Sequence, residues 1–581
     1  MQFLNKYIKK YWKLFLAAVS CLMIEALCDL MQPTIMSKIV DIGVANKEMN
    51  YVLQMGGVML LVTAIGAIGA VSRNILATNV SQRFGADLRS DLYRKVQTFS
   101  FDNIDKFEGA SLVTRLTNDV TQVQNFANGL MRIFVKAPLV GIGSIIMAVR
   151  LNPKMSLILM AVVPVIMMLI YASMRIGYPF FSRVQRSLDR VNGVMREYLS
   201  GVRVVKAFNR FDYETERFEK TNEALVSVSV KAMRVMASFT PGISLTVNLA
   251  IVAILWFGGI RVNNGQMHVG QIIAFINYMT QILFSLMMIS NIFMTFVRAK
   301  ASAERLGEVF EQENLMKVAE KPVQASGEKG RIDFEHVYFS YSGTFGDPVL
   351  KDITFTCRPG ETVGIIGSTG SGKSSLINLI PRFYEAISGK VKVDGVDVKD
   401  MDPKDLREKI SVVPQKTMLF TGTITDNMKW GKETASLEEI KEAAAVAQAH
   451  DFISSFPEGY ETKLGQGGVN LSGGQKQRIS IARALVRNPE ILILDDSTSA
   501  VDVTTEAKIR ESLKEYSKDL TCIIIAQRIT SVMGADKVLV FDNGEIAGMG
   551  THEELIQGCE IYQDIFRSQI GKEMMQYGTA K

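Results

Sequence analysis

The stretch Gly367-Ser-Thr-Gly-Ser-Gly-Lys373-Ser374 decides the fold of the second half of the chain. It has the pattern GxxxxGK[ST] and lies between an apolar, strand-like run (362–366) and a helix-like run (375–380), the context that a phosphate-binding loop requires. Glycines there let backbone N–H groups close around phosphate oxygens, Lys373 supplies positive charge to the β- and γ-phosphates, and Ser374 offers a hydroxyl to Mg²⁺. The stretch therefore predicts a nucleotide-binding α/β domain.

Two motifs nearer the C-terminus belong to the same predicted kind of site. Ile491-Leu-Ile-Leu-Asp495 is an apolar run that ends in a carboxylate, which predicts a buried strand whose Asp495 holds Mg²⁺ through water. Leu471-Ser-Gly-Gly-Gln475 precedes a predicted helix, so Ser472 and the glycines can bind a γ-phosphate through backbone amides and the positive helix end. From Arg331 onward, short apolar strands alternate with helices, as expected of an α/β domain.

The first 300 residues have a different composition. Six apolar stretches there are each long enough to cross a bilayer core, which takes about 20 helical residues. The two long gaps between stretches are rich in Arg and Lys and have heptad-like apolar spacing, which predicts helices that continue into the cytoplasm under the positive-inside rule. Six spans put both termini on one side, and we expect that side to be the cytoplasm, where ATP is found. The stretches lie near 14–34, 52–77, 126–150, 155–178, 238–260 and 269–297, and the long gaps are 78–125 and 179–237.

The predicted fold is thus a polytopic α-helical membrane domain, with six transmembrane helices and long cytoplasmic extensions, fused to an α/β P-loop nucleotide-binding domain. Polar residues with one Pro and two Gly mark a linker between the two domains. We expect the membrane domain over 1–310, the linker over 311–330, the nucleotide-binding domain over 331–568 and a C-terminal tail over 569–581.

Charge and cysteine usage narrow the function classes. The net charge is +6, which is too mild to suggest nucleic acid as a partner and suits a membrane protein with basic loops. The five cysteines form no C-x-x-C pair and accompany no His cluster, so neither a disulfide framework nor a zinc site is expected.

The basic N-terminus runs straight into the first apolar stretch, which favours a retained helix over a cleaved signal peptide. Residues 2–13 mix aromatics and lysines at helical spacing, and they either lie on the membrane face or pack on the protein itself.

The order of these motifs resembles that of the ATP-binding cassette (ABC) transporter superfamily, and in particular its exporter-type half-transporters. Tyr341 occupies the position where the family stacks a tyrosine on adenine, and Gln415 that of the Q-loop glutamine, which touches Mg²⁺. Ser499-Ala-Val-Asp502 is similar to the family's D-loop. Two further stretches are similar to exporter sequences, namely Phe101-Asp-Asn-Ile-Asp-Lys-Phe107 and Leu419-Phe-Thr-Gly-Thr-Ile424.

The resemblance implies a dimer of half-transporters that sandwiches two ATP molecules, each between the P-loop of one subunit and the LSGGQ of the other. It also implies that short coupling helices near 100–108 and 208–216 rest on the ATPase domains, and that ATP-driven closure rocks the membrane helices from inward-open to outward-open. The implied ligands of Mg²⁺ are Ser374, Gln415 and Asp495. The residues implied to bind ATP are Tyr341, Gly367, Ser368, Thr369, Gly370, Ser371, Gly372, Lys373, Ser374, Ser375 and Gln415, and, in trans across the dimer, Leu471, Ser472, Gly473, Gly474 and Gln475.

Two positions of one site depart from the family pattern. The residue after Asp495, usually a Glu that acts as general base, is Asp496, and a misplacement of about 1 Å can cost roughly a hundredfold in rate. The switch residue, usually His, is Gln527, which can hydrogen-bond the γ-phosphate but cannot carry a positive charge or relay a proton. With Gln415 these positions form the predicted catalytic set, and the pattern resembles the degenerate subunit of bacterial heterodimeric multidrug exporters. Gln466 replaces a usual Glu, and the sequence suggests no consequence.

Two carboxylates lie within the first apolar stretch. Glu25 and Asp29 are four residues apart, so they share one face of the predicted helix, in the outer half of the bilayer when counted from Lys13. Ionisable groups at such depth usually face a bundle interior or water. One hypothesis is that they contact cationic substrates or form part of a gate, and the other is that they form a structural pair; the sequence favours neither.

The family resemblance implies an ABC-type ATPase, with ATP and Mg²⁺ as its ligands, that exports hydrophobic or amphipathic compounds. Its own site would turn over slowly, and its partner would be a second, homologous half-transporter with a fast site. The expected contacts further include membrane lipid and small amphipathic or cationic substrates. A lipid or lipopeptide flippase, and a regulatory or channel-like ABC protein with slow ATP turnover, are the alternatives. The expected location is the plasma (inner) membrane of a bacterium, with several membrane passes and both termini in the cytoplasm.

Overall fold

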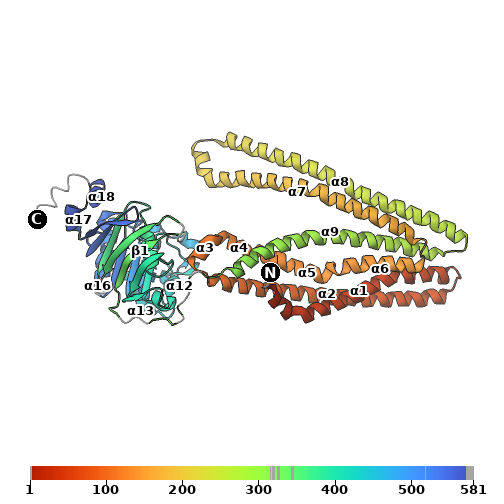
Figure 1. The fold of residues 1–581 in the computed structure, drawn as a ribbon, viewed down its shortest axis with the longest axis horizontal. Coiled ribbons are helices and arrows are strands. Elements are labelled where there is room, and N and C mark those ends of the chain that lie inside the picture. Colours follow the sequence, from red (N-terminus) through yellow and green to blue (C-terminus); the bar gives the residue numbers. More distant parts are fainter. Residues whose placement is uncertain are drawn as a thin grey trace. The chain divides into compact units, whose positions relative to one another are not determined.

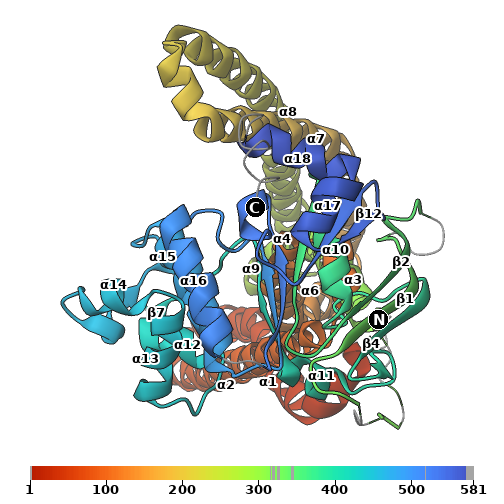
Figure 2. The ribbon, with the colours of Figure 1, turned by 90° about the vertical axis from the view of Figure 1, so that its left-hand side faces the viewer.

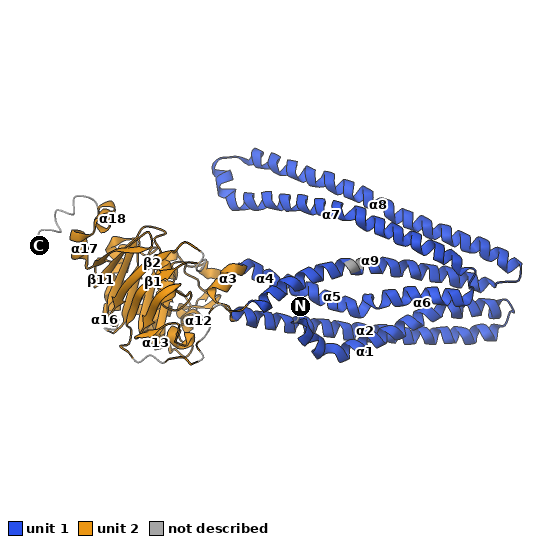
Figure 3. Ribbon diagram, viewed as in Figure 1, with its two compact units in different colours: residues 1–97, 108–312 blue, residues 98–107, 313–581 orange. Residues whose placement is uncertain are grey.

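The chain forms two compact units, which are described separately (Figures 1 and 3). Unit 1 comprises Met1–Gln97 and Glu108–Gln312, and unit 2 comprises Thr98–Phe107 and Glu313–Lys581. The computed structural model describes residues 3–314, 316, 319, 321–323, 327–341, 346–516 and 519–570, without the side chains of 290, 291 and 293. Most of the predicted tail (571–581) and several positions of the predicted linker (315, 317, 318, 320 and 324–326) lie outside the described residues.

Unit 1 is built from long helices. Among the described residues, six helical segments are long and apolar enough to cross a membrane, which confirms the predicted six-helix membrane domain. They are Leu4–Val44, Met49–Gln97, Gly109–Leu151, Ser156–Ala207, Phe211–Asn263 and Val269–Glu311. A short π-helical turn ends the first segment, and two others lie within the third. The elements are α1 (Leu4–Lys38), the π-turn Ile39–Val44, α2 (Met49–Gln97), α4 (Gly109–Thr114), the π-turn Arg115–Asp119, α5 (Val120–Gly129), the π-turn Leu130–Phe134, α6 (Lys136–Leu151), α7 (Ser156–Ala207), α8 (Phe211–Asn263) and α9 (Val269–Glu311).

The helices of unit 1 are longer than a membrane is thick. Helices α7 and α8 have 52 and 53 residues and lie side by side as an antiparallel pair (Figure 1). At about 1.5 Å per residue, a helix of that length spans roughly 78 Å, against about 30 Å for the hydrocarbon core. Both helices therefore continue well beyond the membrane, as the heptad-like spacing of the long gaps predicts.

The N-terminal part of α1 packs on the protein's own α2. Two Lys–Tyr pairs, one helical turn apart on α1, each donate to a single carboxylate of α2. The donors and acceptors are Lys6 and Tyr7 on Asp91, and Lys10 and Tyr11 on Asp87. Of the two interpretations of residues 2–13, the structure thus supports packing on the chain itself.

Tyr7→Phe is expected to lower the free energy of unfolding by about 2 kcal/mol, because it removes a buried hydroxyl that donates to the charged carboxylate of Asp91 over 2.8 Å. Tyr11→Phe removes the equivalent hydrogen bond to Asp87 from a half-buried side chain, so its effect should be smaller. Thermal unfolding of the detergent-solubilised protein measures both. Equal shifts for the two variants would contradict the burial argument.

Unit 2 contains two main sheets. The first is antiparallel, in the order β2-β1-β4-β5, and the second has the order β12-β11-β3-β10-β9-β6, in which every pairing is parallel except that of β12. The strands are β1 (Ile332–Phe339), β2 (Leu350–Cys357), β3 (Thr362–Gly367), β4 (Ser388–Val393), β5 (Val396–Asp397), β6 (Ile410–Val413), β9 (Ile491–Asp495), β10 (Thr521–Ile525), β11 (Lys537–Asp542) and β12 (Glu545–Gly550), with a separate pair β7 (Gly422–Thr423) and β8 (Lys463–Leu464).

Unit 2 contains ten helices among its described residues, several of which pack on the parallel sheet. They are α3 (Phe101–Phe107), α10 (Lys373–Leu379), α11 (Pro403–Lys409), α12 (Ile424–Lys429), α13 (Leu437–Val446), α14 (His450–Ser454), α15 (Gly473–Val486), α16 (Val503–Tyr516), α17 (His552–Gly558) and α18 (Glu560–Ile570), with 3₁₀ turns at Gly459–Glu461, Gln466–Gly468 and Ile529–Ser531. Figure 2 shows α13, α15 and α16 gathered on the side away from β1, β2 and β4. Together with the sheets they confirm the predicted α/β nucleotide-binding domain.

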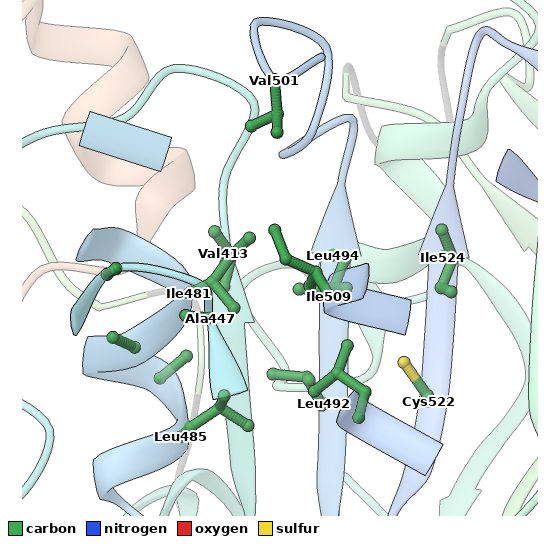
Figure 4. Packing of buried hydrophobic residues seen from close by; sticks show 14 of the residues in the cluster. Val413, Ala447, Ile481, Leu485, Leu492, Leu494, Val501, Ile509, Cys522 and Ile524 are labelled. Atoms are coloured by element: carbon green, nitrogen blue, oxygen red, sulfur yellow. The ribbon is translucent and has the colours of Figure 1, made fainter. Parts of the chain in front are cut away.

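The core explains why the parallel strands are continuous apolar runs. Strands β3, β9 and β10 are buried along nearly their whole length, as parallel strands covered on both faces are. Leu492 and Leu494 of β9 pack with Ile481 of α15 and Ile509 of α16 (Figure 4). This packing fixes the carboxyl ends of β3, β9, β10 and β6 at one edge, where ligands bind in open α/β sheets.

One short helix groups with unit 2 although its flanks belong to unit 1. Phe101 of α3 packs on Phe383 with ring centroids 4.8 Å apart, and Asp105 accepts a hydrogen bond from Tyr384 over 2.7 Å. The prediction that a coupling helix near 100–108 rests on the ATPase domain is confirmed. The second predicted coupling segment, 208–216, covers the turn between α7 and α8 in unit 1, and its contact stays a prediction.

Candidate nucleotide site

The P-loop joins β3 to α10. Gly367 admits no larger residue, because a Cβ atom there would lie 2.1 Å from the carbonyl oxygen of Phe541, and Gly372 has a φ of +100°, which favours glycine. The Lys373 ammonium donates to the carbonyl oxygens of Gly367 and Ser368 over 2.9 and 2.6 Å. Burial lowers the pKa of Lys373. A cation is therefore held inside the loop that is predicted to enclose the phosphates.

The predicted metal ligands meet at the ends of two strands. Ser374, at the start of α10, donates its hydroxyl to Asp495 Oδ1 over 3.1 Å, and Asp495 is the last residue of β9. Burial raises the pKa of Asp495. A hydroxyl and a carboxylate are ligands that a hard cation such as Mg²⁺ accepts, so this pair fits the predicted role. Gln415, the third predicted ligand, instead directs its amide nitrogen toward Asp496.

Asp496 lies between two carboxamides. The side-chain nitrogens of Gln527 and Gln415 donate to the same oxygen, Asp496 Oδ2, over 2.8 and 3.2 Å. The residue is 8 % exposed, and burial raises the pKa of its carboxyl. Its backbone has a φ of +46°, a region that Asp enters more readily than most residues. The structure thus brings all three predicted catalytic residues together, and the lone pairs of one carboxylate oxygen are engaged by neutral donors.

The Leu471–Gln475 motif forms the start of α15. Ser472 is its N-cap and forms a reciprocal capping box with Gln475, in which the backbone N–H of each residue donates to the side-chain oxygen of the other. A Cβ atom at Gly474 would lie 2.8 Å from the carbonyl oxygen of Ala500, so the D-loop packs against the motif too closely for any side chain. Ser472 and Gly473 are exposed, which leaves the positive helix end open to an anion.

Tyr341 lies beside the P-loop. Its hydroxyl is 2.9 Å from the Ser375 hydroxyl, and half of the residue is exposed, so its ring can take a base. The ring of Tyr341 meets that of Tyr384 edge-on, with centroids 5.1 Å apart. Sequence reasoning missed Tyr384, because its partner Asp105 is 279 residues away and no spacing pattern links the two. Gln466 is exposed and begins a 3₁₀ turn, and nothing in the structure explains its replacement of Glu.

The carboxylates of the first span form a charge cluster within unit 1. Glu25 is paired with Arg73 of α2 over 2.8 Å and with Lys136 of α6 over 2.5 Å. Lys136 also reaches Asp29, over 3.0 Å. The four groups carry two charges of each sign, and the side chains of Glu25 and Arg73 are each 9 % exposed. Both carboxylates thus have cationic partners in the same chain, while the Asp29 side chain keeps 37 % exposure.

Comparison with known families and relatives agrees with this geometry. The ABC transporter transmembrane region matches residues 15–287, and the ABC transporter family matches residues 350–499. The uncharacterised ABC transporter ATP-binding protein YfiB of Bacillus subtilis is 42 % identical over 99 % of this chain and 99 % of its own length.

Two further relatives have more specific names. An ATP-dependent lipid A-core flippase of Syntrophus aciditrophicus is 33 % identical over 86 % of this chain and 82 % of its own length. A Staphylococcus aureus protein provisionally named as a multidrug export ATP-binding/permease protein is 34 % identical over 86 % of each chain. Among solved structures, a bacterial Atm1-family ABC exporter with ATP bound shares the fold, with a TM-score of 0.78 and 23 % identity over 96 % of this chain and 98 % of its own.

Proposed function

The chain belongs to the ABC transporters, as an exporter-type half-transporter with one membrane domain and one ATP-hydrolysing domain, and from this we propose that it exports amphipathic compounds as the slow-site half of a heterodimer. In this proposal the P-loop of this chain holds one ATP for long periods. Its Leu471–Gln475 motif completes the fast site of a partner that carries Glu and His at the two catalytic positions.

The arrangement around Asp496 carries the proposal. A general base needs a free lone pair close to the attacking water. Asp496 Oδ2 accepts from both Gln415 and Gln527. An Asp side chain is also one methylene shorter than a Glu, so its carboxylate reaches less far from the backbone. Gln527 offers no charge to the developing γ-phosphate. Both defects impair hydrolysis, whereas Lys373, Ser374 and Asp495 keep the arrangement that nucleotide binding needs.

When Mg²⁺ and ATP are bound, the metal would supply charge neutralisation at the phosphates, and Ser374 with Asp495 would hold it. Lys373 would contact the β- and γ-phosphates and Tyr341 the adenine. The other P-loop residues, Ser368 to Gly372, would contribute backbone N–H groups. The Gln415 carboxamide would offer its oxygen to the metal, because its nitrogen is the atom that donates to Asp496.

The substrate class rests on the relatives and on the membrane domain. One relative is named for multidrug export and one for lipid A-core flipping, so the proposal commits to amphipathic molecules that partition into the bilayer. Lipid flipping stays as a second candidate, because the relative that carries that name matches as well as the other. The proposed location is the plasma membrane of a bacterium, with both termini in the cytoplasm.

Affinity purification of the tagged chain from its native membranes, followed by mass spectrometry, tests the heterodimer. We expect one homologous half-transporter to co-purify, with Glu after its Walker B Asp and a switch His. Recovery of this chain alone would overturn the heterodimer and favour a homodimer with two slow sites. The recovered complex, in proteoliposomes with ATP, is then assayed for extrusion of a lipophilic cationic dye and for movement of a fluorescent phospholipid. Dye extrusion without lipid movement supports drug export, and the reverse supports the flippase.

A further inference from the structure

A chain of aromatic contacts in unit 2 leads from Tyr341 to the coupling helix α3. The ring of Tyr341 meets that of Tyr384 at 88°, and Tyr384 in turn lies 5.9 Å from Phe101 of α3, centroid to centroid. Tyr384, the ring shared by both contacts, is 9 % exposed. Edge-on aromatic pairs have a preferred geometry. A rotation of one ring therefore favours a matching shift of the ring packed against it.

A hydrogen bond adds to the contact between Tyr384 and α3 and fixes its orientation. The Tyr384 hydroxyl donates to Asp105 Oδ2 over 2.7 Å. Burial raises the pKa of Tyr384, which keeps the phenol protonated and able to donate. Asp105 lies on α3 one turn from Phe101, so Tyr384 holds the helix at two points on the same face.

The segment that carries Tyr384 is itself fixed. Arg407 donates to the carbonyl oxygens of Pro381 and Arg382 over 3.0 and 2.8 Å, and its guanidinium lies over the Phe383 ring. A shift of the Tyr384 ring therefore passes to α3 rather than being absorbed by its own backbone.

The other end of the chain of contacts is open to a ligand. Tyr341 is 50 % exposed, and its hydroxyl is within hydrogen-bond distance of Ser375, next to the metal-binding Ser374. A purine stacked on Tyr341 would order that ring against Tyr384. Triphosphate alone, bound at the P-loop, carries no base and would make no stacking contact with the Tyr341 ring.

We propose that Tyr384 and Asp105 are positioning residues: when a nucleobase stacks on Tyr341, they change the position or stability of α3. The polypeptide then carries this change to α2 and α4. The inference rests on the proposed nucleotide site, and it adds that α3 responds to the base and not only to the phosphates. In sequence, α3 follows α2, which ends at Gln97, and precedes α4, which begins at Gly109. A displacement of α3 therefore acts directly on two helical segments of unit 1.

Hydrogen–deuterium exchange on the full-length chain in lipid nanodiscs tests the inference. Exchange is compared with saturating MgATP, with magnesium tripolyphosphate and without ligand. The peptide that spans 367–375 reports phosphate binding, and the peptide that spans 98–108 reports α3, whose Ile104 N–H is bonded to Ser100. In the wild-type chain we expect both ligands to protect the P-loop, and ATP to slow exchange in α3 about tenfold more than tripolyphosphate.

Three variants and one control separate a response of α3 to the base from a general change in stability. Tyr384→Phe keeps the ring but loses the hydroxyl, so the tenfold difference at α3 should fall below about twofold while P-loop protection is unchanged. Asp105→Asn keeps an acceptor oxygen and should preserve the difference, whereas Asp105→Ala should abolish it. Tyr460→Phe is the matched control, because it removes another buried phenol, paired with His450, away from α3, and it should behave as wild type.

Equal protection of α3 by ATP and tripolyphosphate in the wild-type chain would overturn the inference, as would an unchanged difference in Tyr384→Phe. Absence of P-loop protection by ATP would instead refute the proposed nucleotide site, so the two failures are distinguishable.

Discussion

Asp496→Glu combined with Gln527→His is expected to raise ATP hydrolysis at this chain's own site about a hundredfold. The double change restores the longer carboxylate and the charged switch residue, and it removes the Gln527 donor from Asp496 Oδ2. Correcting a misplacement of about 1 Å can account for a factor of that size, and a positioned general base contributes a comparable one. The rate at this site is the phosphate release of the purified complex in nanodiscs minus that of the same complex with Lys373→Ala.

The single changes should fall far short of the double. Asp496→Glu alone leaves the new carboxylate bonded to two carboxamides, and we expect an increase of less than about threefold. Adding Lys373→Ala to the double variant should cancel the increase, because Lys373 belongs to the same site. If Asp496→Glu alone reached the rate of the double variant, the two defects would be independent and the coupled arrangement described here would be wrong.

Glu25→Gln is expected to destabilise the membrane domain by about 3–5 kcal/mol, because it removes the only carboxylate near Arg73 among the described residues and one of the two that Lys136 contacts. Arg73 is 9 % exposed in its side chain and bonds otherwise to the backbone carbonyl of Arg132. An uncompensated cation at that position costs far more than the ion pair contributes. Thermal unfolding in nanodiscs, followed by size-exclusion chromatography with fluorescence detection, measures the shift.

Two matched variants test the charge argument for Glu25. Asp29→Asn should cost about 1 kcal/mol or less, because Lys136 keeps Glu25 and the Asp29 side chain is 37 % exposed. Glu25→Met with Arg73→Met removes both members of the buried pair and should recover most of the stability. If Glu25→Gln unfolds at the temperature of the wild type, the cluster is not structural and the substrate hypothesis gains weight.

The sequence predicts local features well and distant partners poorly. Buried parallel strands are continuous apolar runs, and a phosphate-binding loop needs its glycines in order, so β3, β9 and the P-loop can be located from the sequence. Asp496 and Gln527 follow the adjacent parallel strands β9 and β10, and only the family resemblance, not their spacing, indicates that they share a site. In contrast, Glu25 meets Lys136 across 111 residues, and the choice between a substrate contact and a structural pair depends on that partner.

Helix lengths also exceed what hydropathy alone can define. The apolar stretch near 155–178 covers less than half of α7, because the remaining turns carry polar side chains whose helical state depends on packing against α8. Hydropathy marks where lipid surrounds a helix, and it does not mark where the helix ends. The Lys–Tyr pairs of α1 were ambiguous for the same reason, since their acceptors lie on another helix.

The grouping of α3 with unit 2 has a consequence for dividing the polypeptide. The chain passes between the two units at three points, after Gln97, Phe107 and Gln312, so no single cut separates them cleanly. A fragment that starts at Glu313 would carry both main sheets of unit 2 but would leave the seven-residue helix Phe101–Phe107, which belongs to that unit, on the other fragment. Phe383 and Tyr384 would then lose their contacts with Phe101 and Asp105. A synthetic peptide of residues 98–108, added to the fragment, could restore these contacts.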